Sequence, residues 1–169
     1  AERRGSQRGK WLAKPLASAA FIAVALSSAA LDTHYGRWIL LGLVLCLVGD
    51  VLLIPERRAA VFRAGIVAFL LGHLAFAAAF LTQPRNVFWL ALAGAAVIGA
   101  LLGVWRWLRA RLPADMRLPV QAYFVVIGFM TALACAVTGA GGPAQIAAGA
   151  IAFTASDISV ARDRFVDAG

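Results

Sequence analysis

The chain has 169 residues, of which 62% are hydrophobic and 14% are charged. A mean hydropathy of +0.83 excludes a water-soluble fold, because a chain of this size has too little interior to hide so much apolar surface. The formal charge of +8 does not indicate nucleic acid as a partner, because the basic residues lie between apolar runs. Composition therefore predicts a single membrane-embedded domain over residues 1–169.

Six apolar stretches follow one another along the chain. A bilayer core about 30 Å thick requires roughly 20 apolar residues of helix, and each stretch approaches or exceeds that length. Proline and glycine, which readily end helices, lie at or near the boundaries. The sequence thus predicts an all-α, polytopic transmembrane helical bundle with spans over residues 11–31, 37–54, 60–82, 87–108, 118–138 and 143–162.

Lys and Arg residues are distributed unequally between the two sides of this bundle. Of the 16 Lys and Arg residues, all but Arg37 and Arg85 fall on the side that carries both ends of the chain. Positive residues near span ends stay in the cytoplasm, so both ends are expected there. The alternative is a signal peptide, with an apolar run from Leu16 and small residues 27–30 before Asp32. Its removal would delete the first span and leave the basic loops on the wrong side of the membrane. The richness in Ala, Gly, Arg and Val favours a bacterial plasma membrane.

Three ionisable side chains, Asp50, His73 and Asp157, lie inside predicted spans. Such residues are costly to insert, so they usually face the bundle interior and have a function. At about 1.5 Å per residue, Asp50, Tyr123 and Asp157 lie about five residues from the cytoplasmic end of their spans. Lys14 lies about three residues deep. We expect these four side chains to line a cavity open to the cytoplasmic leaflet, with His73 near the midplane as its floor.

Each of these residues also has a purely structural interpretation. The aspartates can pair with Lys14 or an arginine to fix helix packing, and His73 can serve as an interhelical hydrogen-bond donor. Lys14 can extend to the interface, and Tyr123 lies near the depth of an aromatic belt. Ser156, which precedes Asp157, is a further polar candidate.

The sequence contains no constellation of metal ligands. Cys46 and Cys135 each lie deep within an apolar run with no second cysteine nearby, so we interpret both as small apolar residues. No metal and no cofactor are therefore expected. Nothing in the sequence fixes an oligomeric state.

Five short pieces of the chain place polar residues or glycines among apolar ones. In chain order they are Lys14-Pro15-Leu16, Gly49-Asp50-Val51-Leu52-Leu53, Phe69-Leu70-Leu71-Gly72-His73, Tyr123 with Met130, and Gly149-Ala150 with Phe153 and Ser156-Asp157. Together they resemble the YhhN family of membrane proteins, whose studied members are lysoplasmalogenases. The family is a compact bundle usually of about eight spans, so this chain with six is expected to lack a terminal span.

The resemblance implies hydrolysis of the vinyl ether bond of a lysoplasmalogen to a fatty aldehyde and glycerophosphoethanolamine or glycerophosphocholine. Protonation of the outer alkene carbon creates an oxocarbenium ion, which water captures as a hemiacetal. Two carboxyl groups in a low-dielectric cavity can divide the acid and base roles, because burial and mutual repulsion keep one of them protonated. We therefore predict Asp50 and Asp157 as the catalytic pair, in either order. The expected partners are the lysophospholipid substrate and membrane lipids.

The remaining candidates would bind the substrate. Lys14 or nearby arginines would hold the phosphate, and Tyr123 and His73 would orient water or the glycerol hydroxyl, with Ser156 beside them. The alternative function is a proton-coupled transporter of a small polar solute, because buried Asp and His also form proton relays. Transporters usually show inverted repeats and helices broken near the midplane, whereas these aspartates lie toward one leaflet. In a third interpretation, a noncatalytic scaffold, the shared depth would be accidental.

Overall fold

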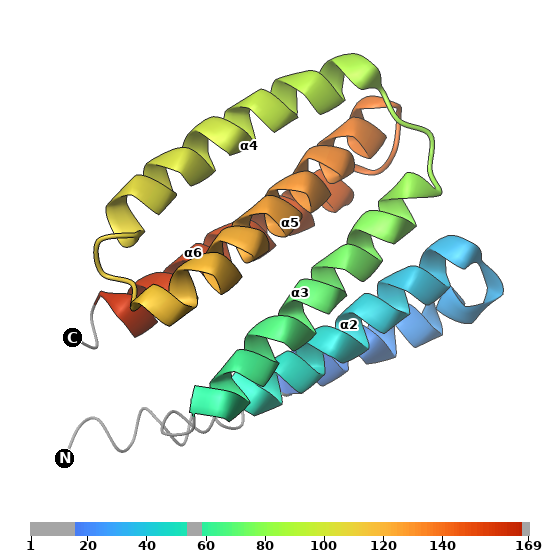
Figure 1. Cartoon of the computed structure of the whole chain (residues 1–169). Helices are drawn as coiled ribbons and strands as arrows, with labels where there is room; N and C mark the ends of the chain where they lie inside the picture. The colour runs from blue at the N-terminus through green and yellow to red at the C-terminus, as the bar shows by residue number, and fades with distance from the viewer. Residues whose placement is uncertain (1–15, 54–58, 167–169) are drawn as a thin grey trace. The chain divides into compact units, whose positions relative to one another are not determined.

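The structure, a computed structural model, describes residues 16–53 and 59–166. All regular secondary structure in this part of the chain is helical (Figure 1). A short apolar helix, Leu16–Ser27, and the 3₁₀ helix η1, Ala30–Asp32, come first. Five helices long and apolar enough to cross a membrane follow, which makes this an integral membrane protein. They are α2 (His34–Leu53), α3 (Ala59–Leu81), α4 (Val87–Leu108), α5 (Ala114–Gly139) and α6 (Ala144–Phe165).

The predicted all-α transmembrane architecture is confirmed, and α2 to α6 match five of the predicted spans to within a few residues. The first predicted span coincides with Leu16–Ser27, and its beginning lies outside the described residues. This helix ends earlier than expected. The hydroxyls of Ser27 and Ser28 both donate to the Val24 carbonyl over 2.8 Å, and Ala29 adopts a left-handed φ of 55°.

Helix α5 begins earlier than expected, at Ala114, and includes Pro119, which the sequence placed at a boundary. Proline lacks the N–H that would bond to the carbonyl four residues back. Here that carbonyl belongs to Asp115 in the exposed first turn of α5, where water can replace the lost bond. The helix therefore continues through the proline.

The chain forms two compact units, Ala1–Ala79 and Phe80–Gly169. The single domain expected from the sequence stays a prediction. In the first unit a tight turn leads from the Leu16–Ser27 helix into α2. Gly36 permits this turn, because a Cβ at that position would lie 2.2 Å from the Ala30 carbonyl oxygen. Arg37 closes the turn, since its Nε donates to the Leu31 carbonyl over 2.7 Å.

Helices α2 and α3 pack as an antiparallel pair, which we call the glycine seam. At each contact a side chain of one helix packs against a glycine of the other. The contacts are Gly42 with Phe76, Cys46 with Gly72, Gly49 with Phe69, and Leu53 with Gly65. Positions advance by steps of four and three along both helices, which keeps all the contacts on one face of each helix. Small residues of this kind allow helices in lipid to approach closely.

In the second unit α5 packs against both α4 and α6 (Figure 1). The side chain of Asn86 caps the N-terminus of α4 by accepting from the backbone N–H groups of Phe88 and Trp89. The Trp89 ring covers Gly139 of α5, where an added Cβ would lie 2.2 Å from the indole. Gly141, with φ of 99°, makes the turn from α5 into α6.

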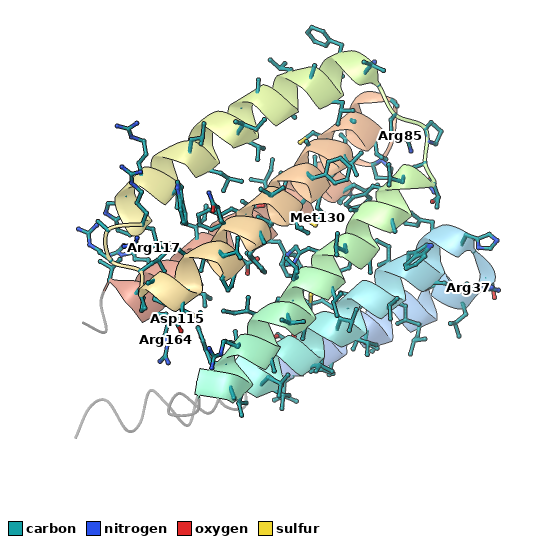
Figure 2. The ribbon with its side chains drawn as sticks, in the orientation of Figure 1. Arg37, Arg85, Asp115, Arg117, Met130 and Arg164 are labelled. Carbon is teal, nitrogen blue, oxygen red and sulfur yellow. The ribbon has the colours of Figure 1, made fainter. Side chains whose placement is uncertain are left out.

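The two ends of the second unit differ in charge. Figure 2 shows Arg117 and Arg164 at one end, together with Asp115, whereas Arg85 lies at the opposite end. Arg85 Nη1 donates to the carbonyls of Leu81 and Gln83, so its charge is held against the end of α3. The end of the unit that carries Arg117 is the one that the sequence assigns to the cytoplasm.

Candidate functional site

Asp50 lies in the last turn of α2, where its half-buried carboxylate accepts a hydrogen bond from Ser18. The distance from Ser18 Oγ to Asp50 Oδ2 is 2.6 Å, a short O–H···O hydrogen bond. The neighbouring Gly49 faces Phe69 in the glycine seam. Successive helical residues point about 100° apart, so Asp50 turns away from the seam toward the Leu16–Ser27 helix. One carboxylate is thereby fixed between two helices.

His73 is fully buried on α3, between two phenylalanines of the glycine seam. Its Nδ1 lies 2.7 Å from the Phe69 carbonyl oxygen, one turn earlier on the same helix. The imidazole centroid lies 6.5 Å from the Phe69 ring and 6.1 Å from the Phe76 ring, edge-on to the latter. Because Phe69 and Phe76 are themselves set by Gly49 and Gly42, the histidine is positioned by the packing of α2 on α3.

Asp157 on α6 accepts a hydrogen bond from Tyr123 on α5. The distance from Tyr123 Oη to Asp157 Oδ2 is 2.6 Å, and both side chains are half-buried. This bond has the same length as that between Ser18 and Asp50, at the short end of the range for O–H···O hydrogen bonds. Among the predicted site residues that the structure describes, Tyr123 and Asp157 are thus joined by a hydrogen bond.

A second polar contact joins α5 to α6 deeper in the second unit. Thr131 and Thr154 lie with their Oγ1 atoms 2.7 Å apart, and Thr131 is only 2% exposed. Each hydroxyl also lies within hydrogen-bond distance of a carbonyl of its own helix, Ile127 at 2.9 Å and Ala150 at 3.0 Å. One threonine donates to the other, and the acceptor donates to its own helix. We call these two contacts, Tyr123–Asp157 and Thr131–Thr154, the hydroxyl seam.

The other predicted site residues are placed differently. Lys14 lies outside the described residues, so its predicted contact with phosphate or with Asp50 stays a prediction. Ser156 is exposed on α6, and its side chain points about 100° away from that of Asp157. Asp50 belongs to the first unit and Asp157 to the second, so the catalytic pair also stays a prediction.

Within residues 16–53 and 59–166, no group of three or more His, Cys, Asp or Glu residues has the geometry of a metal site. Cys46 is buried with its Sγ against Gly72 of the glycine seam, as expected of a small apolar residue. Cys135 is half-buried on α5. Among the described residues, the predicted site thus offers hydroxyls, an imidazole and the carboxyl groups of Asp50 and Asp157.

Comparison with known proteins identifies the chain. The sequence profile of the YhhN family matches residues 9–169. The chain belongs to the YhhN family. Similar proteins include a lysoplasmalogenase of Mycobacterium bovis and a lysoplasmalogenase of Mycobacterium tuberculosis, each 34% identical over 157 residues. Each alignment covers 87% of this chain and 58% of the relative, so the chain spans a little over half the length of these relatives. No solved structure matches.

Two features of this YhhN chain were not anticipated from its sequence. Ser18, the partner of Asp50, lies four residues after Lys14 in the sequence, the spacing of one turn in the predicted span, which was the available signal. Thr154 lies three residues before Asp157. That spacing places Thr154 on the α5-facing side of α6, together with the carboxylate.

Proposed function

We propose that this YhhN protein is a lysoplasmalogenase-like hydrolase, which cleaves the vinyl ether bond of a lysoplasmalogen to a fatty aldehyde and glycerophosphoethanolamine or glycerophosphocholine. The observation that carries the proposal is that each unit holds an aspartate in an apolar helix, with one carboxylate oxygen bonded to a hydroxyl at 2.6 Å. The names of the mycobacterial relatives support the reaction class. The ionisable residues inside the membrane support a polar reaction there.

The reaction needs one proton donor and one proton acceptor. One aspartate, in its protonated form, delivers a proton to the outer alkene carbon, and the double-bond electrons form the new C–H bond. The resulting oxocarbenium ion is stabilised by the negative charge of the second aspartate. That carboxylate then removes a proton from the attacking water, and the hemiacetal collapses to the aldehyde and the glycerol hydroxyl. In this proposal Asp50 and Asp157 act on one substrate molecule.

The hydroxyl partners keep each carboxylate in one orientation. Tyr123 donates a hydrogen bond to Oδ2 of Asp157, and Ser18 donates one to Oδ2 of Asp50. Each aspartate side chain is thereby held in a single rotamer. Fixing a catalytic group before the substrate binds lowers the entropic cost of reaching the transition state. We assign Tyr123 and Ser18 as positioning residues, and we retain His73, Lys14 and Ser156 as proposed contributors to substrate binding.

The test is aldehyde release from an alkenyl lysophosphatidylethanolamine by membranes containing the full chain. We expect Asp50→Asn and Asp157→Asn each to lower the rate by about 10²- to 10⁴-fold, the usual contribution of a general acid or base. Asp163→Asn is the matched control, because Asp163 is an exposed aspartate near the C-terminal end of α6. Its rate should equal that of the unaltered protein when expression is equal.

Two results would contradict the proposal. Full activity in a well-expressed Asp50→Asn or Asp157→Asn protein would remove that residue from the reaction. An absence of aldehyde release by the unaltered protein, together with uptake of a polar solute into vesicles without chemical change, would favour the transporter instead.

We also propose that the protein lies in a bacterial plasma membrane with both ends of this chain in the cytoplasm. The excess of arginine at the Arg117 end of the second unit supports this orientation. Labelling of single engineered cysteines in intact cells tests it. Cysteines in the 109–113 loop should be protected from an impermeant reagent, and cysteines in the 82–86 loop should react.

A further inference from the structure

An open pocket of about 310 Å³ lies at one end of the second unit, where the last turn of α4 meets the first turns of α5. It is lined by Trp105, Arg109, Ala110 and Arg117. Its volume is at the lower end of the range for small-molecule sites, roughly 300–1,000 Å³. The pocket therefore has room for a compact charged group, and its lining contains two guanidinium groups and no carboxylate.

The two guanidinium groups of this pocket differ from their neighbour Arg111. Arg111 Nη1 donates to the Trp107 carbonyl over 2.8 Å, and its Cζ lies 5.3 Å from the centre of the Trp107 ring. Its charge is thus engaged by α4 itself. Within residues 16–53 and 59–166, the side chains of Arg109 and Arg117 make no hydrogen bond or ion pair. Two like charges line one pocket, and an anion between them would relieve their repulsion.

The residues that line the pocket are of the kinds found at the depth of the lipid head groups. Trp105 is half-buried on α4, with its ring edge-on to Phe124 of α5 at 6.5 Å. Tryptophan is enriched where hydrocarbon meets head groups, and Arg109 follows the last residue of α4. Leu108, next to Arg109, is completely buried. The pocket lining thus combines an aromatic side chain with two arginines at a span end.

We propose that this pocket binds the phosphate of an anionic phospholipid, with Arg109 and Arg117 as its ligands. Guanidinium groups bind phosphate oxygens through paired hydrogen bonds, and basic pockets between transmembrane helices are suited to anionic head groups. The pocket offers no carboxylate for the ammonium of a choline or ethanolamine head group, so an anionic lipid is favoured over a zwitterionic one. Neither Tyr123 nor Asp157 lines this pocket, and lipid binding there does not depend on the proposed hydrolysis.

The test is native mass spectrometry of the purified full chain in neutral detergent, with phosphatidylglycerol added in steps. We expect one phosphatidylglycerol to bind with saturation, and R109Q/R117Q to weaken that binding by at least about tenfold. R106Q/R111Q is the matched control. It removes two positive charges from the same end of α4 without changing the pocket lining, and it should shift the affinity by less than about threefold.

Two further probes distinguish the source of the phosphate. Phosphatidylcholine should bind at least about tenfold more weakly than phosphatidylglycerol, because its net charge is zero. Inorganic phosphate should compete only at millimolar concentration, because it lacks acyl chains that insert beside Trp105. Equal affinity for phosphatidylcholine, or for inorganic phosphate, would overturn the assignment to an anionic lipid.

If R109Q/R117Q does not fold, a second variant still tests the proposal. R109K/R117K keeps both charges but loses the planar donor pair, and it should bind phosphatidylglycerol several-fold more weakly than the unaltered protein. Unchanged affinity in both the lysine pair and the glutamine pair, or equal losses in R109Q/R117Q and R106Q/R111Q, would show that general positive charge and not this pocket binds the lipid. Measurement of bound lipid needs no catalytic turnover, so failure here is distinguishable from failure of the proposed function.

Discussion

The glycine seam and the hydroxyl seam join helices by different means. Between lipid-embedded helices the hydrophobic effect supplies little attraction, so close packing and interhelical hydrogen bonds must hold them together. In the glycine seam, rings fill the spaces above glycines, and Asp50 points out of the contact toward a third helix. In the hydroxyl seam, Asp157 is itself part of the contact. The geometry of Asp157 therefore depends on the helix pair it joins, whereas that of Asp50 depends on Ser18.

The largest stability effect is expected in the glycine seam. A Cβ added by Gly49→Ala would lie 2.5 Å from the Phe69 ring, so the ring and the helices must move. Overpacking of this kind costs about 1–3 kcal/mol of unfolding free energy. Denaturant titration of the detergent-solubilised protein measures it. Gly99→Ala on α4 is the control, because nothing lies within 4 Å of the added methyl group. Equal stability of the two variants would contradict the packing described for the seam.

An intermediate effect is expected at the hydroxyl partner of Asp157. Tyr123→Phe removes one hydrogen bond to the carboxylate and leaves the ring, so we expect aldehyde release to fall about tenfold through kcat. Ser18→Ala should lower the rate comparably while leaving the hydroxyl seam intact. Tyr35→Phe makes the same chemical change at the chain's other tyrosine, near the start of α2, and should leave the rate unchanged. A loss in Tyr35→Phe as large as that in Tyr123→Phe would refute a specific role for the Tyr123 hydroxyl.

The smallest effect is expected for the threonine contact. Thr131→Val and Thr154→Val each remove one hydroxyl with little change of shape, and hydrogen bonds between membrane helices average about 0.6 kcal/mol. In a double-mutant cycle of unfolding free energy, the coupling between the two positions should be of about this size. Additive losses would indicate that each hydroxyl bonds only to its own helix, through Ile127 and Ala150.

The sequence was sufficient for the architecture because a bilayer imposes a simple length and hydropathy rule. The limits of α2, α3, α4 and α6 follow from apolar runs that end near proline, glycine or charge. Pro119 misled the prediction because proline is tolerated early in a helix, where few backbone bonds are lost. Composition could not distinguish a proline that precedes a helix from one that lies early within it.

The candidate site was only partly predictable. Asp50 and Asp157 stand out because charge is rare in apolar helices, and counting residues from the span ends placed Tyr123 at the depth of Asp157. Ser18 carries no charge, so only its spacing from Lys14 distinguished it from other small polar residues. The pocket at Arg109 was not predicted, because a basic span end fulfils the topology rule whether or not its arginines line a cavity.

The register of the glycine seam has an evolutionary consequence. A single inserted residue in the stretch 42–53 of α2 would rotate everything beyond it by about 100°. A ring would then meet a bulky side chain where a glycine is needed, and His73 would lose the packing that orients its imidazole. The packing of α2 on α3 can tolerate single substitutions, but it cannot tolerate insertions or deletions, because these change the register. Related chains should therefore align without gaps across 42–53 and 65–76, while the loops at 82–86 and 109–113 vary freely in length.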